Sequence, residues 1–101
     1  MKTLKVIRIT HAFQSFAPAD IRAAWIGCRI PLHEEQVKAI VRLRALDENG
    51  AHLVLKEDAI RALEAMGRND AAHYWRNQPM EVIAFPKSCC ELAEEQDLSR
   101  P

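Results

Sequence analysis

Polar and apolar residues alternate in the middle of the chain, where they predict a β-strand. Over residues 37–46, apolar side chains occupy every second position, and a period of two is typical of a strand with one buried face. A helix is the alternative, because two glutamates follow Pro31 in the way that acids occupy a first helical turn. Wound as a helix, however, the apolar residues would leave no polar stripe. We therefore expect a helical turn near 32–37 at most, followed by a strand.

A tight turn is predicted at Asn49-Gly50, because both residues tolerate a positive φ angle and the pair is common in short β-hairpins. Residues 51–56 resume an extended pattern and are expected to form the second strand of this hairpin. The prediction is therefore that residues 39–46 and 51–56 pair in antiparallel fashion.

The next segment, about 58–77, has the apolar spacing of two short helices. Asp58 is placed to cap the first helix by accepting a hydrogen bond from a free backbone amide, and Gly67 to end it in the left-handed conformation. Pro79 ends the second helix, because the residue before proline is disfavoured in the α region. We expect Trp75 to anchor the second helix in the core. The apolar stripe of the first helix consists of Ala59, Ile60, Ala62, Leu63 and Met66.

Further strands are predicted on both sides of this central part. Branched residues over 4–13 favour a first strand, and alternation over 80–85 favours a last one. Between residues 18 and 37 the pattern fits both a helix and a strand. We expect a brief helical turn that begins at Pro18, followed by a strand over 25–30.

The C-terminal part is predicted to be helical, because Ser88 and Glu91 have the spacing of a capping box. Cys89 and Cys90 would lie at the start of this helix, where the helix dipole could lower a thiol pKa. A zinc site could in principle combine these two cysteines with Cys28 and a histidine. Adjacent cysteines, however, cannot easily turn both sulfur atoms towards one tetrahedral ion. We therefore expect no metal and no other cofactor, and the simplest interpretation is that these thiols are core or incidental residues.

Together these elements predict an α+β fold. It would contain a largely antiparallel sheet of four to five strands, the helical segment 58–77 packed on one face, and a short C-terminal helix. A chain of this length is expected to form one domain over residues 1–101, with the ends, about 1–2 and 97–101, disordered.

The amino-acid composition indicates a globular domain and argues against a membrane-spanning protein. An apolar content of 49% with 28% charged residues is typical of a globular domain, and no apolar run approaches the roughly 20 residues of a membrane span. Arg8 occupies a position where a signal peptide would need its apolar core. Three cysteines without a disulfide framework favour a reducing compartment. We therefore expect a cytoplasmic protein of bacterial type.

Charge is unevenly distributed although the net charge is zero. Residues 1–46 carry eight Lys and Arg against three Asp and Glu, whereas residues 47–101 carry six against eleven. One interpretation is that the two halves pack together and neutralise each other. The other is a self-complementary surface that favours a homodimer.

Nucleic-acid binding is a further hypothesis, because Lys38, Arg42 and Arg44 would share one face of the predicted strand. A basic two-stranded ribbon can contact phosphates. The zero net charge and the acidic second half argue against a polyanion as the partner, so we do not favour this interpretation.

Aromatic residues provide the remaining candidate site. Trp25, His73, Tyr74 and Trp75 include three of the six aromatic side chains, and Tyr74 and His73 must point away from the face that buries Trp75. Tyrosine and tryptophan are favoured where one end of the ring is buried and the other meets a polar group. They predict a pocket, a dimer surface, or a core with one exposed tyrosine.

The function that the sequence favours is that of a small accessory domain that acts by binding. Its partner would be a second copy, another protein, or a small molecule held between the sheet and the 58–77 helices. The alternative is a small enzyme with a site near Trp25, Cys28, His73 and Tyr74.

Overall fold

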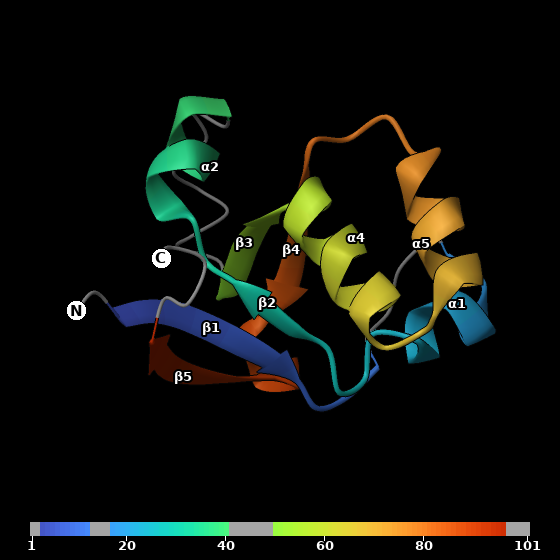
Figure 1. The fold of residues 1–101 in the computed structure, drawn as a ribbon, viewed down its shortest axis with the longest axis horizontal. Coiled ribbons are helices and arrows are strands. Elements are labelled where there is room, and N and C mark those ends of the chain that lie inside the picture. Colours follow the sequence, from blue (N-terminus) through green and yellow to red (C-terminus); the bar gives the residue numbers. More distant parts are fainter. Residues whose placement is uncertain (1–2, 13–16, 41–49, 97–101) are drawn as a thin grey trace.

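The chain alternates short strands and helices, and it folds into two antiparallel sheets with helices between and around them (Figure 1). The structure is a computed structural model, and it describes residues 3–12, 17–40 and 50–96. These residues confirm the α+β class. In order, the elements are β1 (Thr3–Ile9), α1 (Ala19–Ala23), β2 (Arg29–Pro31), α2 (Glu34–Ile40), β3 (Ala51–Leu55), α4 (Lys56–Ala65), α5 (Asn69–Arg76), β4 (Val82–Pro86), a 3-10 turn (Lys87–Cys89) and β5 (Cys90–Gln96).

The five described strands are divided between two sheets. The first has the order β2-β1-β5, with Ile7 of β1 opposite Ile30 on one side and Leu92 on the other. The second consists of β3 and β4, with Val54 opposite Ile83. All pairings are antiparallel, as predicted, but the expected single sheet of four to five strands is replaced by these two.

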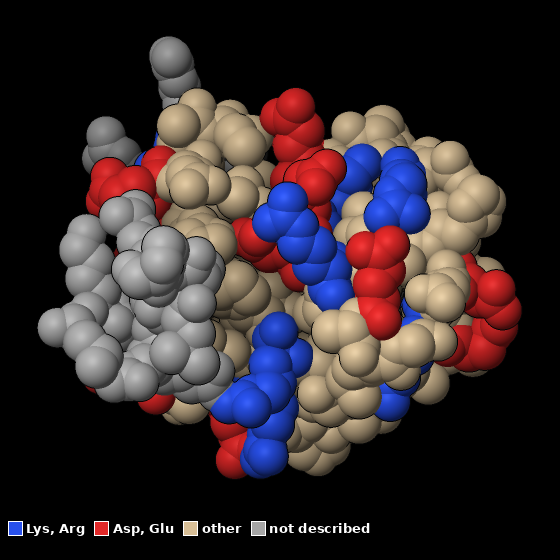
Figure 2. All heavy atoms as spheres, in the orientation of Figure 1, with Lys and Arg blue, Asp and Glu red and all other residues tan. Residues whose placement is uncertain are grey.

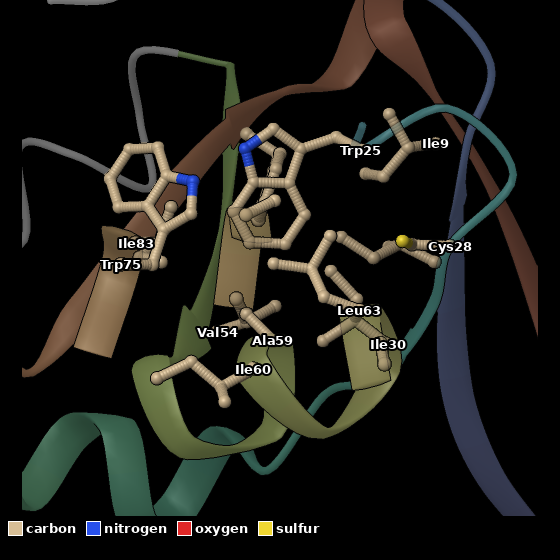
Figure 3. Close-up of a cluster of buried hydrophobic side chains, with 14 of the residues drawn as sticks. Ile9, Trp25, Cys28, Ile30, Val54, Ala59, Ile60, Leu63, Trp75 and Ile83 are labelled. Carbon is tan, nitrogen blue, oxygen red and sulfur yellow. The ribbon is translucent and has the colours of Figure 1, made fainter. Parts of the chain in front are cut away.

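One cluster of apolar side chains joins the two sheets and the helices. Trp25 lies at its centre, with its ring centroid 5.5 Å from that of Trp75 and 4.9 Å from that of Phe85. Trp75 is only 3% exposed, which confirms its predicted role as the core anchor of α5. Figure 3 shows side chains from α4, β2 and the two-stranded sheet converging on the same cluster, among them Val54, Ala59, Ile60, Leu63 and Ile83.

The end of α4 follows the sequence prediction, but its start does not. Gly67 has a φ angle of +73°, and its amide donates to the Glu64 carbonyl while the Arg68 amide donates to the Leu63 carbonyl. These two bonds form a Schellman motif. At the other end the helix begins at Lys56, and the predicted cap is wrong, because Asp58 lies inside the first turn and its carboxylate contacts His33.

The strand predicted over residues 37–46 is wrong for residues 37–40, which form the second half of α2. The His33 carbonyl accepts a hydrogen bond from the Val37 amide, and two acids occupy the first turn, where they stabilise the N-terminus of the helix. Residues 41–49 lie outside the described part, so the predicted hairpin partner cannot be placed. The second strand of that hairpin is confirmed as β3, which pairs with β4.

The predicted C-terminal helix is also wrong. After the single 3-10 turn, Cys90 adopts an extended conformation with φ −132° and ψ 154°, and β5 runs along the whole of β1. This pairing places Glu91 opposite Arg8 and Glu94 opposite Lys5. A helix would have left one edge of β1 unpaired and lost both opposite-charge pairs, which stabilise neighbouring strands.

The strand predicted over residues 25–30 is confirmed only at its end, because β2 begins at Arg29. Helix α1 starts directly after Pro18, in agreement with the predicted helical turn. The chain then reverses at Gly27, whose φ angle is +89° and whose amide donates to the Ile9 carbonyl. Trp25 therefore lies in the turn and reaches the core from there. No helix among the described residues has the length and apolar character needed to cross a bilayer.

Candidate functional site

Two of the predicted site residues, Trp25 and Cys28, are completely buried in the core (Figure 3). The Cys28 thiol lies 3.6 Å from the Ala24 carbonyl oxygen, to which it donates a weak hydrogen bond. Burial raises the pKa of the Cys28 thiol, and this effect outweighs the opposing influence of Arg68. At neutral pH the group is therefore a protonated core thiol, which is a poor nucleophile.

The other two predicted residues lie on α5. His73 is exposed and its ring contacts the Asn77 side-chain amide at 3.2 Å. Tyr74 is half-buried, and its ring packs edge-on against Trp75 with the centroids 5.3 Å apart. Tyr74 therefore extends the aromatic cluster towards the surface, whereas His73 points away from Trp25 and Cys28 in the core.

The predicted basic face falls mostly outside the described residues. Lys38 is exposed on α2, whereas Arg42 and Arg44 lie outside the described residues. Figure 2 shows basic and acidic side chains interspersed over the face that carries α4, without a broad field of one sign. A mixed surface of this kind does not attract the phosphate backbone of a nucleic acid strongly.

Cys89 ends the 3-10 turn and Cys90 begins β5, so the N-terminus of an α-helix that was expected to lower their pKa is absent. Cys90 donates to the Pro86 carbonyl at 3.3 Å, and burial, with a smaller effect of Cys89, raises its pKa to about 11. Within the described ranges, His, Cys, Asp and Glu side chains do not gather in groups of three or more that could hold a metal ion.

An open groove lies between α1 and the start of α5. Its volume is about 400 Å³, within the usual size range of ligand sites. Two helices and the turn after α4 build it, because the Schellman motif at Gly67 turns the chain so that α5 begins beside α1. Figure 1 shows α1 and α5 together at one end of the molecule. The groove is lined by Asp20, Ile21, Ala24, Gly67, Arg68, Asn69, Asp70 and Ala71.

Arg68 fastens the two walls of this groove together. Its guanidinium donates hydrogen bonds to the backbone carbonyls of Ala24 and Ile26, which follow α1 and lack helical partners. The guanidinium of Arg68 is therefore already hydrogen-bonded to the end of α1, and the side chain is half-buried. Asp20 and Asp70, both exposed, are the remaining charged residues of the lining, so the groove combines two carboxylates with the apolar side chains of Ile21, Ala24 and Ala71.

The sequence did not predict a second polar feature, a pair formed by His33 and Asp58. The His33 Nδ1 atom and the Asp58 Oδ2 atom are 2.6 Å apart, and the carboxylate is buried. The two residues are 25 positions apart and form no recognisable motif. The sequence instead predicted that Asp58 accepts a hydrogen bond from a backbone amide at the start of its own helix. The only hint in the sequence was the position of His33, directly before the two glutamates that begin α2.

Searches against models of known protein families, curated protein sequences and solved structures find no match for this chain.

Proposed function

We propose that this protein is a binding domain whose groove between α1 and α5 holds a basic, partly apolar segment of a protein partner. The proposal rests on the groove itself, a cavity of about 400 Å³ lined by three apolar side chains and two carboxylates. Acids are common in the first turns of helices, where they stabilise the N-terminus. Helix stability does not require, however, that Asp20 and Asp70 from two separate helices line the same cavity.

The side chains that line the groove indicate which kind of ligand would bind there. Ile21, Ala24 and Ala71 offer apolar contact, and the guanidinium of Arg68 is engaged by backbone carbonyls. The carboxylates of Asp20 and Asp70 therefore determine the charge that a ligand meets. A lysine or arginine beside an apolar residue complements this lining, and an open groove suits an exposed chain segment.

Two short acetylated peptides test the proposal, one composed of lysine and leucine and the other with glutamate in place of lysine. Amide signals of Ala24, Gly67 and Asn69 are followed by NMR during titration. We expect these signals to shift with the lysine peptide and not with the glutamate peptide. The Asp20→Asn/Asp70→Asn variant is expected to weaken binding by about two- to thirtyfold, since each of two exposed ion pairs contributes about 0.2–1 kcal/mol.

The matched control is Glu35→Gln, which removes an exposed acid from α2 at the opposite end of the molecule (Figure 1). Its peptide affinity should equal that of the wild type. Equal affinity of the double variant and the wild type would show that the peptide binds elsewhere. Melting temperatures of all variants establish that the loss of two helix-terminal acids has not unfolded the protein.

Self-association is a second candidate function, and the edge of β4 that faces away from β3 is the surface that would form the contact. Among the described residues β4 pairs with β3 alone, and the strand Val82–Pro86 has no charged side chain. Uncharged strand edges favour pairing with another chain. The charge asymmetry of the two halves is a weaker argument for a dimer, because Arg8 pairs with Glu91 and Lys5 lies opposite Glu94 within one chain.

Sedimentation at two protein concentrations and two salt concentrations tests this candidate. An edge contact through β4 is apolar, so we expect a dimer whose dissociation constant is little changed between low and molar salt. Dissociation at high salt would instead assign the contact to charged surfaces. A monomer of 11.5 kDa under all four conditions would exclude self-association at those concentrations.

A further inference from the structure

The contact between His33 and Asp58 joins two elements that are distant in the sequence. His33 lies between β2 and α2, and Asp58 lies in the first turn of α4. The Nδ1 to Oδ2 distance is 2.6 Å, with Asp58 6% exposed and the His33 side chain 33% exposed. Among the described residues, Asp58 is the one charged side chain in the buried class.

This arrangement determines which ring nitrogen is available. An ionised carboxylate can only accept a hydrogen bond, so the proton between the two groups belongs to Nδ1 of His33. In the neutral ring the lone pair is then on Nε2, which has no hydrogen-bond partner in the described part of the chain. Nδ1 faces a buried carboxylate, and the His33 side chain as a whole is 33% exposed. Asp58 thus holds the ring through Nδ1 and leaves Nε2 as the basic nitrogen of a partly exposed side chain.

We propose that His33 is a general base for the hydrolysis of a carboxylic ester and that Asp58 is its positioning residue. Nε2 takes a proton from a water molecule as the water oxygen forms a bond to the ester carbon. The carbonyl electron pair moves to oxygen, and the Asp58 carboxylate stabilises the imidazolium. When the intermediate collapses, the bond to the alcohol oxygen breaks and the imidazolium returns its proton to that oxygen. One water is consumed, and one acid and one alcohol are released.

The charges around the pair favour an uncharged substrate. Glu34 and Glu57 are the sequence neighbours of the two residues, and each faces a cation, Lys5 at 3.9 Å and Arg61 at 3.9 Å respectively. Arg61 also lies 3.8 Å from Oδ1 of Asp58. These pairs leave no surplus of positive charge to hold an anion such as a phosphodiester, so a neutral ester is the better match.

This site is separate from the groove. Asp58 lies in the first turn of α4, whereas Gly67 and Arg68 of the groove follow its last turn. A helix of this length spans about 15 Å. Loss of peptide binding at the groove and loss of hydrolysis at His33 are therefore independent results.

The test uses p-nitrophenyl acetate as the probe and compares the wild type with His33→Gln. Glutamine retains an N–H donor for Asp58 but has no basic nitrogen. We expect kcat/KM of the wild type to exceed that of His33→Gln by about 100-fold, the lower range for general-base catalysis. The matched control His73→Gln removes an exposed imidazole on α5 and should retain the wild-type rate. Far-UV circular dichroism verifies that all variants are folded.

The role of Asp58 is tested by the tautomer of His33, which NMR reports through the nitrogen shifts of the ring. The wild type is expected to carry the proton of neutral His33 on Nδ1, and Asp58→Asn to move it to Nε2, because the new amide can donate to Nδ1. The rate should fall with this change. Equal rates for the wild type and His33→Gln, or a neutral wild-type ring protonated on Nε2, would overturn the proposal.

Discussion

Replacing Trp75 by alanine is expected to lower the free energy of unfolding by about 3–5 kcal/mol, the usual cost of emptying a large aromatic site. Trp75 is 3% exposed, and its ring lies 5.5 Å from that of Trp25, which itself contacts Phe85. The alanine variant removes the largest side chain that α5 contributes to this cluster and leaves a cavity in its place. Urea denaturation followed by circular dichroism measures the loss, with an unchanged m-value expected.

Tyr74→Ala is the matched control, because Tyr74 precedes Trp75 on the same helix and is only half-buried. Its ring contributes an edge-on contact with Trp75, and such aromatic pairs contribute about 0.5–1.5 kcal/mol. We expect a loss of that size. Equal losses for the two variants would contradict the assignment of Trp75 as the anchor of α5.

His33→Leu is expected to destabilise the protein by about 3 kcal/mol, whereas His33→Gln should cost much less. Leucine removes the donor that faces Oδ2 of Asp58, and a buried carboxylate without a partner is strongly unfavourable. Arg61 lies 3.8 Å from the other carboxylate oxygen but is exposed, so it offsets only part of the loss. Thermal and urea unfolding of the three proteins at neutral pH measure these differences.

The double variant His33→Leu/Asp58→Leu provides the control. Replacing both partners of a buried pair by apolar groups is often close to neutral, so we expect it to recover most of the stability lost by His33→Leu. The two single changes would then be strongly non-additive. If His33→Leu is as stable as the wild type, the carboxylate does not depend on His33, and the contact is not a stabilising one.

The sequence by itself determined those elements whose boundaries depend on nearby residues. Gly67 ends α4 because only a residue that tolerates a positive φ angle can close a Schellman motif there. Trp75 is buried because helical spacing aligns it with Ala71 and Ala72. The strands β1, β3 and β4 and the helices α4 and α5 follow from the same local patterns, which depend on residues a few positions apart.

Tertiary contacts decided two of the segments that the local patterns assigned wrongly. Residues 37–40 alternate as a strand would, yet they continue a helix that starts at Glu34 and packs on β3. Residues 90–96 follow a plausible capping box, yet they pair with β1, which has a complementary charge opposite Glu91 and Glu94. Short segments have weak intrinsic preferences, so pairing and packing with distant residues outweigh them.

Both candidate sites also come from tertiary structure alone. The groove needs α1 and α5 side by side, which the guanidinium of Arg68 secures across more than forty residues of sequence. The pair of His33 and Asp58 needs the start of α4 beside the end of β2. Residue types can be read from a sequence, whereas the approach of two side chains is set by how the whole chain buries its apolar surface, because that burial dominates the energy of folding.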